Sequence, residues 1–354
     1  MYQVKFDLVQ LVVFIFLLGT CKKWCGQTER EELSCKFSKV SYFSSNCWFV
    51  ATLCSPPCLL VSNTSNILAV DYKTAAIRSI ISGLTRAVAL DVHFSLGFIF
   101  WSDVAEQNIK RFRIDTASTT TVITGIGVCD GLAVDWRALE LYWTDTTHNT
   151  ISVSDLDGKN QRTLISLGFA DQPRAINLDL DSGLMIWTDW GANPKIERAL
   201  LNGSQRLAIV TTNLYWPNGI ELDRGNKRIV WVDAGYDRVE SVDYSGSNRK
   251  LLYQQQYLHP FDVALIPPFL FLTDWVALKE AHQLDAATGN VLRSFNINGG
   301  QPMGIVPYDR SRQPSGIYAV LLQFVTVLFI SLTNYSLHCP QIAWPNLGEY
   351  RNKY

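Results

Sequence analysis

The sequence predicts an all-β protein, a six-bladed β-propeller in which each blade is a four-stranded antiparallel sheet. The main observation is a short aromatic word ending in aspartate that recurs along the chain. Its copies are Phe100-Trp101-Ser102-Asp103, Tyr142-Trp143-Thr144-Asp145, Ile186-Trp187-Thr188-Asp189, Val230-Trp231-Val232-Asp233 and a degraded Phe271-Leu272-Thr273-Asp274. The steps between the Trp positions are 42, 44, 44 and 41 residues. A period in the low forties made of strand-forming residues indicates an array of small sheets.

Each repeat holds enough strands for one blade. A word such as Leu132-Ala133-Val134-Asp135 precedes each Trp word by about eight to ten residues, with turn formers between them. The aspartates that end this second word are spaced by 44 residues: Asp91, Asp135, Asp179 and Asp223. Downstream, Asp157-Gly158 separates two further strand-forming runs, which is a strong hairpin signal. One repeat is therefore a four-stranded meander, the unit of a propeller blade.

The number of blades follows from the copies and from both ends of the array. Full copies begin near five positions: Thr85, Cys129, Gln172, Tyr215 and His259. Residues 58–61, 67–71 and 76–80 read as three more strands, and residues 302–306 read as the innermost strand of a blade that then stops. Joining these halves predicts a sixth blade that closes the ring.

The repeated word resembles that of the YWTD six-bladed propellers of the low-density lipoprotein receptor superfamily. Longer strings are similar to the first propeller of the Wnt co-receptors in the low-density lipoprotein receptor-related family. They include Asp171-Gln172-Pro173-Arg174, Trp187-Thr188-Asp189-Trp190-Gly191, Pro194-Lys195-Ile196-Glu197, Tyr215-Trp216-Pro217-Asn218-Gly219 and His259-Pro260-Phe261. The resemblance covers about residues 57–314, which we take as the propeller, and covers neither end of the chain.

The N-terminal end predicts a secreted protein. Residues 1–20 read as a signal peptide because residues 8–19 form a short apolar run, although an uncleaved anchor is the alternative. Residues 21–56 form a Cys-rich leader, either a disulfide module or a segment of no defined structure. Six cysteines lie before or at the start of the propeller, and their pairing stays open: Cys21, Cys25, Cys35, Cys47, Cys54 and Cys58. Cys129 is expected to be a buried apolar residue.

Residues 315–354 depart from the family, whose propellers are followed by a cysteine-rich EGF-like module. The uncharged run 316–332 is at the lower limit for a transmembrane helix, and it could equally be non-native sequence at a broken gene end. We therefore expect the protein at the extracellular face of the plasma membrane or secreted.

Two rings of residues are predicted around one opening of the channel. Counting back five from each recurring Asp, and following the equivalent Pro, gives a mouth ring of Arg86, Asp130, Arg174, Asn218, Phe261 and Met303. The residues after each Trp-word Asp give a second ring of Val104, Thr146, Trp190, Ala234 and Trp275. The Trp of each word, repeated at one phase, reads as scaffold, whereas aromatic and Arg side chains at a rim are typical anchors of a protein interface.

The resemblance implies what this face binds. In the similar propellers it takes short Asn-x-Ile segments of secreted Wnt antagonists, and the ligand Asn pairs with the position matched by Asn218. Trp190 and Trp216 match positions that flank the apolar ligand residue, while Arg174 and His259 match rim positions. Wnt ligands or Wnt antagonists are thus the expected partners of a propeller of the co-receptor type, either a receptor or a truncated decoy form, which we expect to be monomeric.

Other functions are less well supported by the sequence. The net charge of −1 gives no indication of nucleic-acid binding, and the sequence shows no catalytic constellation, so we expect neither an enzyme nor a cofactor. A histidine-based ligand-release propeller is one alternative. A calcium-dependent propeller hydrolase is another, although arginines at the mouth would repel calcium. Three sequons predict N-glycosylation at Asn63, Asn202 and Asn334.

Overall fold

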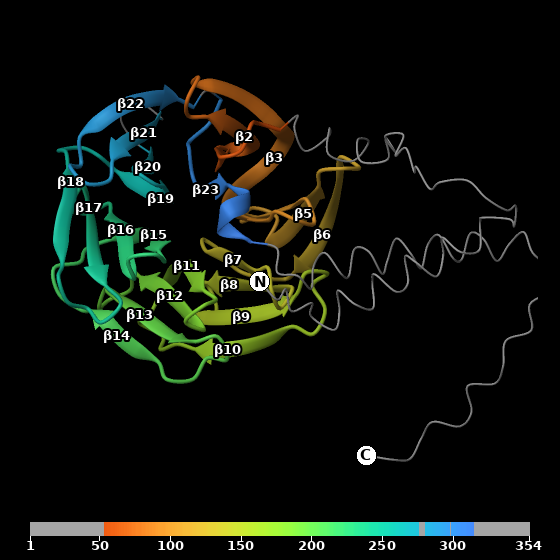
Figure 1. Cartoon of the computed structure of the whole chain (residues 1–354). Coiled ribbons are helices and arrows are strands. Elements are labelled where there is room, and N and C mark those ends of the chain that lie inside the picture. Colours follow the sequence, from red (N-terminus) through yellow and green to blue (C-terminus); the bar gives the residue numbers. More distant parts are fainter. Residues whose placement is uncertain (1–52, 276–279, 298, 315–354) are drawn as a thin grey trace, which may run out of the picture. The chain divides into compact units, whose positions relative to one another are not determined.

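The computed structural model describes residues 53–275, 280–297 and 299–314, which belong to one compact unit. These residues form 23 strands and one short 3-10 helix, η1 (Arg310–Arg312). Four blades are separate four-stranded antiparallel sheets, and a seven-stranded sheet supplies the other two. The predicted all-β, six-bladed propeller is thereby confirmed, with the blades in chain order around a ring (Figure 1).

Blades 2 to 5 follow one another along the chain, each beginning with its innermost strand. Their strands are β7 (Leu132–Asp135), β8 (Glu140–Asp145), β9 (Thr150–Asp155), β10 (Arg162–Ser166), β11 (Pro173–Asp179), β12 (Leu184–Asp189), β13 (Lys195–Leu200), β14 (Leu207–Val210), β15 (Pro217–Asp223), β16 (Arg228–Asp233), β17 (Arg238–Asp243), β18 (Lys250–Gln254), β19 (Pro260–Ile266), β20 (Phe269–Asp274), β21 (Glu280–Asp285) and β22 (Val291–Asn296).

The seven-stranded sheet holds blades 1 and 6, because both share one long strand. Its strands are β1 (Cys58–Ser62), β2 (Thr64–Asp71), β3 (Ala76–His93), β4 (Phe98–Asp103), β5 (Asn108–Arg113), β6 (Ser118–Thr124) and β23 (Ile305–Tyr308). The first half of β3 pairs with β2 in blade 6, and its second half pairs with β4 in blade 1.

The ring closes where the two ends of the array meet. Strand β23 pairs antiparallel with β1, so that Val61 lies opposite Ile305. In Figure 1, the blue strand β23 accordingly joins the orange blade that holds β2. Blade 6 thus combines three N-terminal strands with one C-terminal strand, and the closure predicted from the sequence is confirmed.

The centre of the ring is lined by the first strand of each blade. Strands β3, β7, β11, β15, β19 and β23 each contact the next one around the ring. We call the end at which these strands begin the mouth face. The opposite end, where the inner strands of blades 1 to 5 turn back into their partner strands, is the hairpin face.

A Trp word performs up to three structural tasks. Its Trp is buried between blades, as Trp101, Trp187 and Trp231 show with no exposed surface. Its hydroxyl residue joins neighbouring blades: Thr188 Oγ1 accepts from Ala175 N at 3.1 Å and donates to Asn218 O at 2.7 Å. Its Asp accepts backbone N–H groups of the mouth-face loops. The Trp side chains are therefore scaffold.

The recurring aspartates are not all equivalent, contrary to the sequence-based count. Asp135 lies opposite Glu140 and accepts from Arg137 N and Ala138 N, which caps the hairpin turn. Asp91 lies two positions earlier in its strand, opposite Phe100. His93 takes the capping place in blade 1, where its Nδ1 accepts from Leu96 N at 3.3 Å. The spacing of 44 is coincidental there, because the first interval between Trp positions is shorter.

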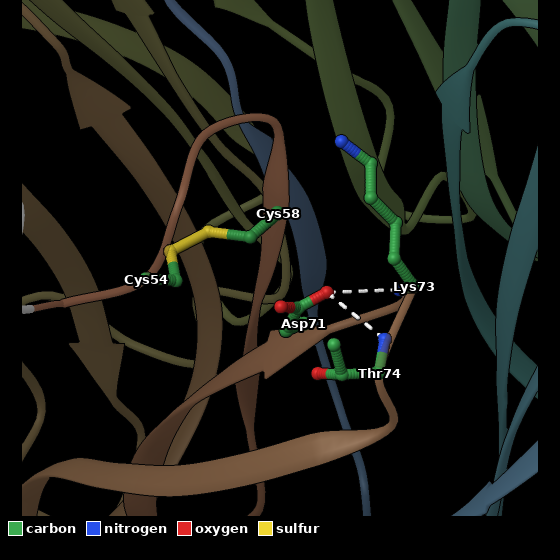
Figure 2. The surroundings of a disulfide bond; sticks show 5 residues. All are labelled: Cys54, Cys58, Asp71, Lys73 and Thr74. Atoms are coloured by element: carbon green, nitrogen blue, oxygen red, sulfur yellow. Dashed lines mark hydrogen bonds between the residues drawn. A yellow bond between two sulfur atoms is a disulfide. The ribbon is translucent and has the colours of Figure 1, made fainter.

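Among the cysteines, Cys54 and Cys58 form a disulfide at the start of β1 (Figure 2). Figure 2 also shows Asp71 accepting from the backbone N–H groups of Lys73 and Thr74, the same turn cap in blade 6. Cys129 is a buried free thiol, as expected. The predicted signal peptide, the other leader cysteines and the 316–332 run lie outside the described residues. The described residues contain no helix that is long and apolar enough to span a bilayer.

Candidate functional site

Strand pairing places five of the six predicted mouth residues at one register position. Each lies two residues before the residue that faces the Trp position of its blade: Asp130, Arg174, Asn218, Phe261 and Met303. In blade 1 this position belongs to Val88, because Leu90 faces Trp101. The assignment of Arg86 to the ring was wrong, since it was counted from the out-of-register Asp91. Arg86 is an exposed residue two positions farther out, equivalent to Trp216 and His259.

One half of the mouth is apolar and closed. Val88, Phe261 and Met303 form a buried cluster beneath Trp275. The Trp275 ring stacks on Phe261 at 5.1 Å, and its Nε1 donates to Met303 Sδ at 2.8 Å. Phe261 and Met303 are therefore a floor rather than surface contacts, and Trp275 is the side chain above them.

The other half of the mouth carries a buried cation. The Arg174 guanidinium lies between the rings of Trp190 and Phe261, at 4.3 and 5.1 Å from their centroids. Its Nε is 3.7 Å from Asp130 Oδ2, which is an ion-pair contact but too long for a hydrogen bond. Burial lowers the pKa of Arg174, an effect that Asp130 and Asp262 oppose. Within the described residues this guanidinium donates no hydrogen bond, so its N–H groups are free to donate to a ligand.

Asn218 offers the complementary group. Its side chain is only 2 % exposed, and its Nδ2 donates to Pro260 O at 2.9 Å. Its Oδ1 is buried without a hydrogen-bond partner in the described part of the chain. Asn218 lines a small cavity with Asp130, Arg174 and Phe261. A buried acceptor left unpaired is costly, so this socket favours a ligand that donates to it.

An aromatic row borders the socket. The Trp216 ring meets His259 edge-on at 6.0 Å, and His259 stacks on Trp275 at 5.8 Å. Burial lowers the pKa of His259, and the nearby carboxylates of Asp274 and Asp237 partly oppose this lowering. The imidazole is therefore neutral near pH 7. Trp216 is exposed and Trp190 is half-buried. The row is thus an apolar, uncharged rim beside a polar socket.

Sequence reasoning missed several aromatic side chains of this face. Every exposed aromatic residue in the described part of the chain lies in a mouth-face loop: Phe169, Tyr215, Trp216, Tyr236 and Tyr257. Only Trp216 was a candidate. The usable signal was the presence of aromatic residues in the loops between one blade and the next, where packing does not require them.

The hairpin face has a different character. Ion pairs cover it, among them Arg137 with Asp181, Lys227 with Asp179 and Arg228 with Asp243. A cavity of about 570 Å³ at this end of the channel is lined in part by Asp91, Glu221, Arg224, Asp262 and Arg312. Burial raises the pKa of Asp91 to about 6 and that of Asp262 to about 7. The two faces therefore offer partners different surfaces, one aromatic and one charged.

The sequons differ in accessibility. Asn63 is fully buried, and its Oδ1 accepts from Asn66 N at 2.9 Å. A glycan on this amide does not fit the folded blade, so the structure argues against modification at Asn63. Asn202 is exposed and remains a predicted site, while Asn334 lies outside the described residues.

Comparison with known sequences identifies the repeats. Residues 140–180 and 183–223 match the model of the low-density lipoprotein receptor repeat class B. The chain is also 35 % identical, over 193 residues, to the human low-density lipoprotein receptor-related protein 5-like protein. That alignment covers 54 % of this chain and 76 % of the relative.

Comparison with solved structures supports the same fold. A chain in a crystal structure of a nidogen/laminin complex matches with a TM-score of 0.67 and 28 % identity, over 71 % of this chain and 98 % of that one. A gluconolactonase from Xanthomonas campestris matches with a TM-score of 0.55 and 15 % identity, over 71 % of this chain and 88 % of the enzyme. At that identity the second likeness is one of fold alone.

Proposed function

This chain belongs to the low-density lipoprotein receptor-related family of class B (YWTD) repeat proteins, and from this premise we propose that it is an extracellular propeller that binds protein ligands through its mouth face. The ligands we propose are Wnt ligands or secreted Wnt antagonists that present an Asn-x-Ile segment. The observation that carries the proposal is the socket, where the buried Asn218 Oδ1 has no hydrogen-bond partner among the described residues and shares a small cavity with the Arg174 guanidinium.

The chemistry of an asparagine side chain suits this socket. Its amide N–H donates to Asn218 Oδ1 while its carbonyl accepts from Arg174, so that one ligand group bonds to both side chains. The apolar residue two positions later then packs on the ring of Trp190 or Trp216. Trp216 is exposed and accessible to a ligand. Trp190 is held in place by the Arg174 guanidinium, which lies 4.3 Å from its ring centroid. Aromatic anchors beside a desolvated polar pair are typical of binding hot spots.

The alternatives draw less support from the same residues. A ligand-release mechanism needs histidines that gain charge on mild acidification, and the one histidine of the aromatic row has a lowered pKa. A hydrolase needs reacting groups at the mouth, where Asp130 instead faces the cation of Arg174. We therefore propose a binding protein that acts at the cell surface or after secretion, not an enzyme.

Calorimetry with the full chain tests this proposal. The probe is a capped synthetic peptide with Asn-Ala-Ile at its centre. Asn218→Ala should weaken its binding by about 1–3 kcal/mol, because the ligand amide loses its partner. Trp190→Ala should weaken it by about 2 kcal/mol through loss of an apolar anchor.

The matched control is Leu96→Ala, which removes an exposed apolar side chain from the hairpin face. It should leave peptide affinity unchanged. If Asn218→Ala and Trp190→Ala both bind like the parent while their circular dichroism and melting stay intact, the mouth is not the binding site.

A further inference from the structure

Three exposed tyrosines lie outside Trp216 on the mouth face of blades 4 and 5. Tyr215 precedes β15, Tyr236 lies between β16 and β17, and Tyr257 precedes β19. We call them the outer tyrosine surface. Tyr257 has 74 % of its surface exposed, an unusual value for a large aromatic residue in an ordered loop. The mouth socket does not use any of the three.

The surface is continuous with the mouth. The Tyr215 ring lies 4.9 Å from that of Trp216 and 5.7 Å from that of Tyr236. Gly235 makes this packing possible, since a Cβ there would lie 1.9 Å from Tyr215 Cδ1. The line of rings from Trp216 through Tyr215 to Tyr236 is as long as about three residues of an extended chain.

The rings are held in place by their neighbours. The Arg238 guanidinium lies 4.5 Å from the Tyr236 centroid. Arg238 also pairs with Glu240 at 2.9 Å and donates to Asn213 O at 2.5 Å. Arg249 shares the same Glu240 carboxylate at 2.7 Å, and the Asp237 carboxylate of this loop balances the second guanidinium. The cluster therefore stiffens the aromatic surface without giving it a net charge.

Tyr257 is held in a strained backbone conformation. Its φ of 66° lies in the left-handed region, which a tyrosine rarely adopts. The conformation is fixed because Tyr257 N donates to Asp237 Oδ2 at 3.0 Å, and Gln255 N donates to Asp237 O at 3.2 Å. Two loops are thus tied together, with one tyrosine of each exposed.

We propose that the outer tyrosine surface binds an uncharged, apolar segment that flanks the Asn-x-Ile motif in the same ligand chain. The inference rests on the proposed function, because the socket sets the register of the ligand. A chain that leaves the socket over Trp216 meets the faces of Tyr215 and Tyr236 next. Those faces are preordered and uncharged, so they favour aliphatic or proline side chains over acidic or basic ones.

The test uses the full chain and four synthetic peptides. One has the Asn-Ala-Ile core alone, two carry three apolar residues on its N-terminal or C-terminal side, and one carries three glutamates on the better of these sides. We expect the better apolar flank to raise affinity about tenfold over the core, as one added aromatic-packed anchor does. The glutamate flank should give no gain.

The decisive variant combines Tyr236→Ser with Tyr257→Asn, since asparagine tolerates the left-handed conformation. It should remove the gain from the apolar flank while binding the core peptide like the parent. Leu251→Ser is the matched control, because Leu251 is an exposed apolar residue on the outer edge of blade 4. This control should keep the gain.

The outcomes separate the two proposals. If the core binds but neither flank adds affinity, or if the double variant keeps the gain, the outer tyrosine surface is not a ligand contact and the proposed function stands. If the core does not bind, the proposed function fails. A peptide with the flank but no motif then tests the surface alone: binding lost in the double variant supports it, and absence of binding overturns it.

Discussion

At the scale of single residues, Val232 marks a missing bond between blades. In the other five blades, a hydroxyl at the equivalent position donates to a carbonyl oxygen on the next inner strand or in the residues just before it. The donors are Ser62, Ser102, Thr144, Thr188 and Thr273. In blade 4 the Trp word carries Val232, which is fully buried. The boundary between blades 4 and 5 therefore lacks a bond that every other boundary has.

Val232→Thr should restore that bond. The new hydroxyl would donate to Phe261 O and accept from Gly219 N, as Thr188 does with the equivalent groups in blade 3. We expect the free energy of unfolding to rise by about 1 kcal/mol, measured by urea denaturation. The control is Val239→Thr, at a buried position of β17 without this pattern, which should lower it. A loss of stability in both variants would contradict the prediction.

Residue-level reasoning from sequence failed where one position was inferred by counting. Asp91 keeps the spacing of 44 yet lies two places out of register, and this moved the mouth assignment from Val88 to Arg86. The burial of Asn218, Phe261 and Met303 could not be predicted from the sequence either, because a position in the mouth ring does not tell whether a neighbouring side chain covers it. Asp130, Arg174 and Asn218 did meet in one cavity, since a repeat places equivalent residues around one axis.

At the scale of elements, one aspartate holds the loops that carry the proposed site. Asp233 ends β16 and accepts from the backbone of Tyr215, Trp216 and Gly235 at 2.9 to 3.0 Å, and of Tyr236 at 3.2 Å. The Trp word therefore determines both the blade and the position of its aromatic loops.

Asp233→Ala should weaken both stability and binding. It leaves several backbone N–H groups without an acceptor, which should cost about 2–4 kcal/mol of folding free energy. The loops before β15 and after β16 should loosen, so affinity for the Asn-Ala-Ile peptide should fall. Urea denaturation and calorimetry measure the two effects.

Asp223→Ala supplies the matched comparison. Asp223 caps a turn on the hairpin face by accepting from Asn226 N and Nδ2. Its loss should lower stability to a smaller extent and leave peptide affinity unchanged. Equal affinity losses in the two variants would show that Asp233 acts through general destabilisation and not through the mouth loops.

The sequence predicted the elements well because each blade repeats strand-forming runs separated by turn signals. It did not predict that β3 runs unbroken from blade 6 into blade 1, since Ala76–His93 contains Gly83 and reads as two strands. Gly83 adopts a φ of 76° inside this strand. Exposed loop aromatics such as Tyr257 were missed because loops carry no periodic pattern from which exposure can be inferred.

At the scale of the whole molecule, closure depends on the last described residues as well as on β23. Arg312, in η1, donates to Leu265 O and to Glu221 Oε1, both at 2.8 Å. Gln313 donates to Val92 O at 2.7 Å, and its Oε1 accepts from Phe94 N at 2.7 Å. The chain thus leaves blade 6 and bonds to blades 1, 4 and 5 across the hairpin end of the channel.

Two changes of graded severity test this closure. Deleting residues 300–314 removes β23, so the inner edge of β1 loses its partner and the ring opens. We expect an aggregating protein, because open strand edges pair with other chains.

The double substitution Arg312→Ala with Gln313→Ala keeps β23 and should lower the free energy of unfolding by about 2–4 kcal/mol, since it leaves the buried Glu221 carboxylate and several backbone groups with fewer partners. Arg310→Ala, at an exposed residue of the same short helix, is the control and should behave like the parent. Size-exclusion chromatography and urea denaturation measure both effects. A deletion protein that elutes as a monomer with the urea midpoint of the parent would mean that five blades and three strands are stable without closure.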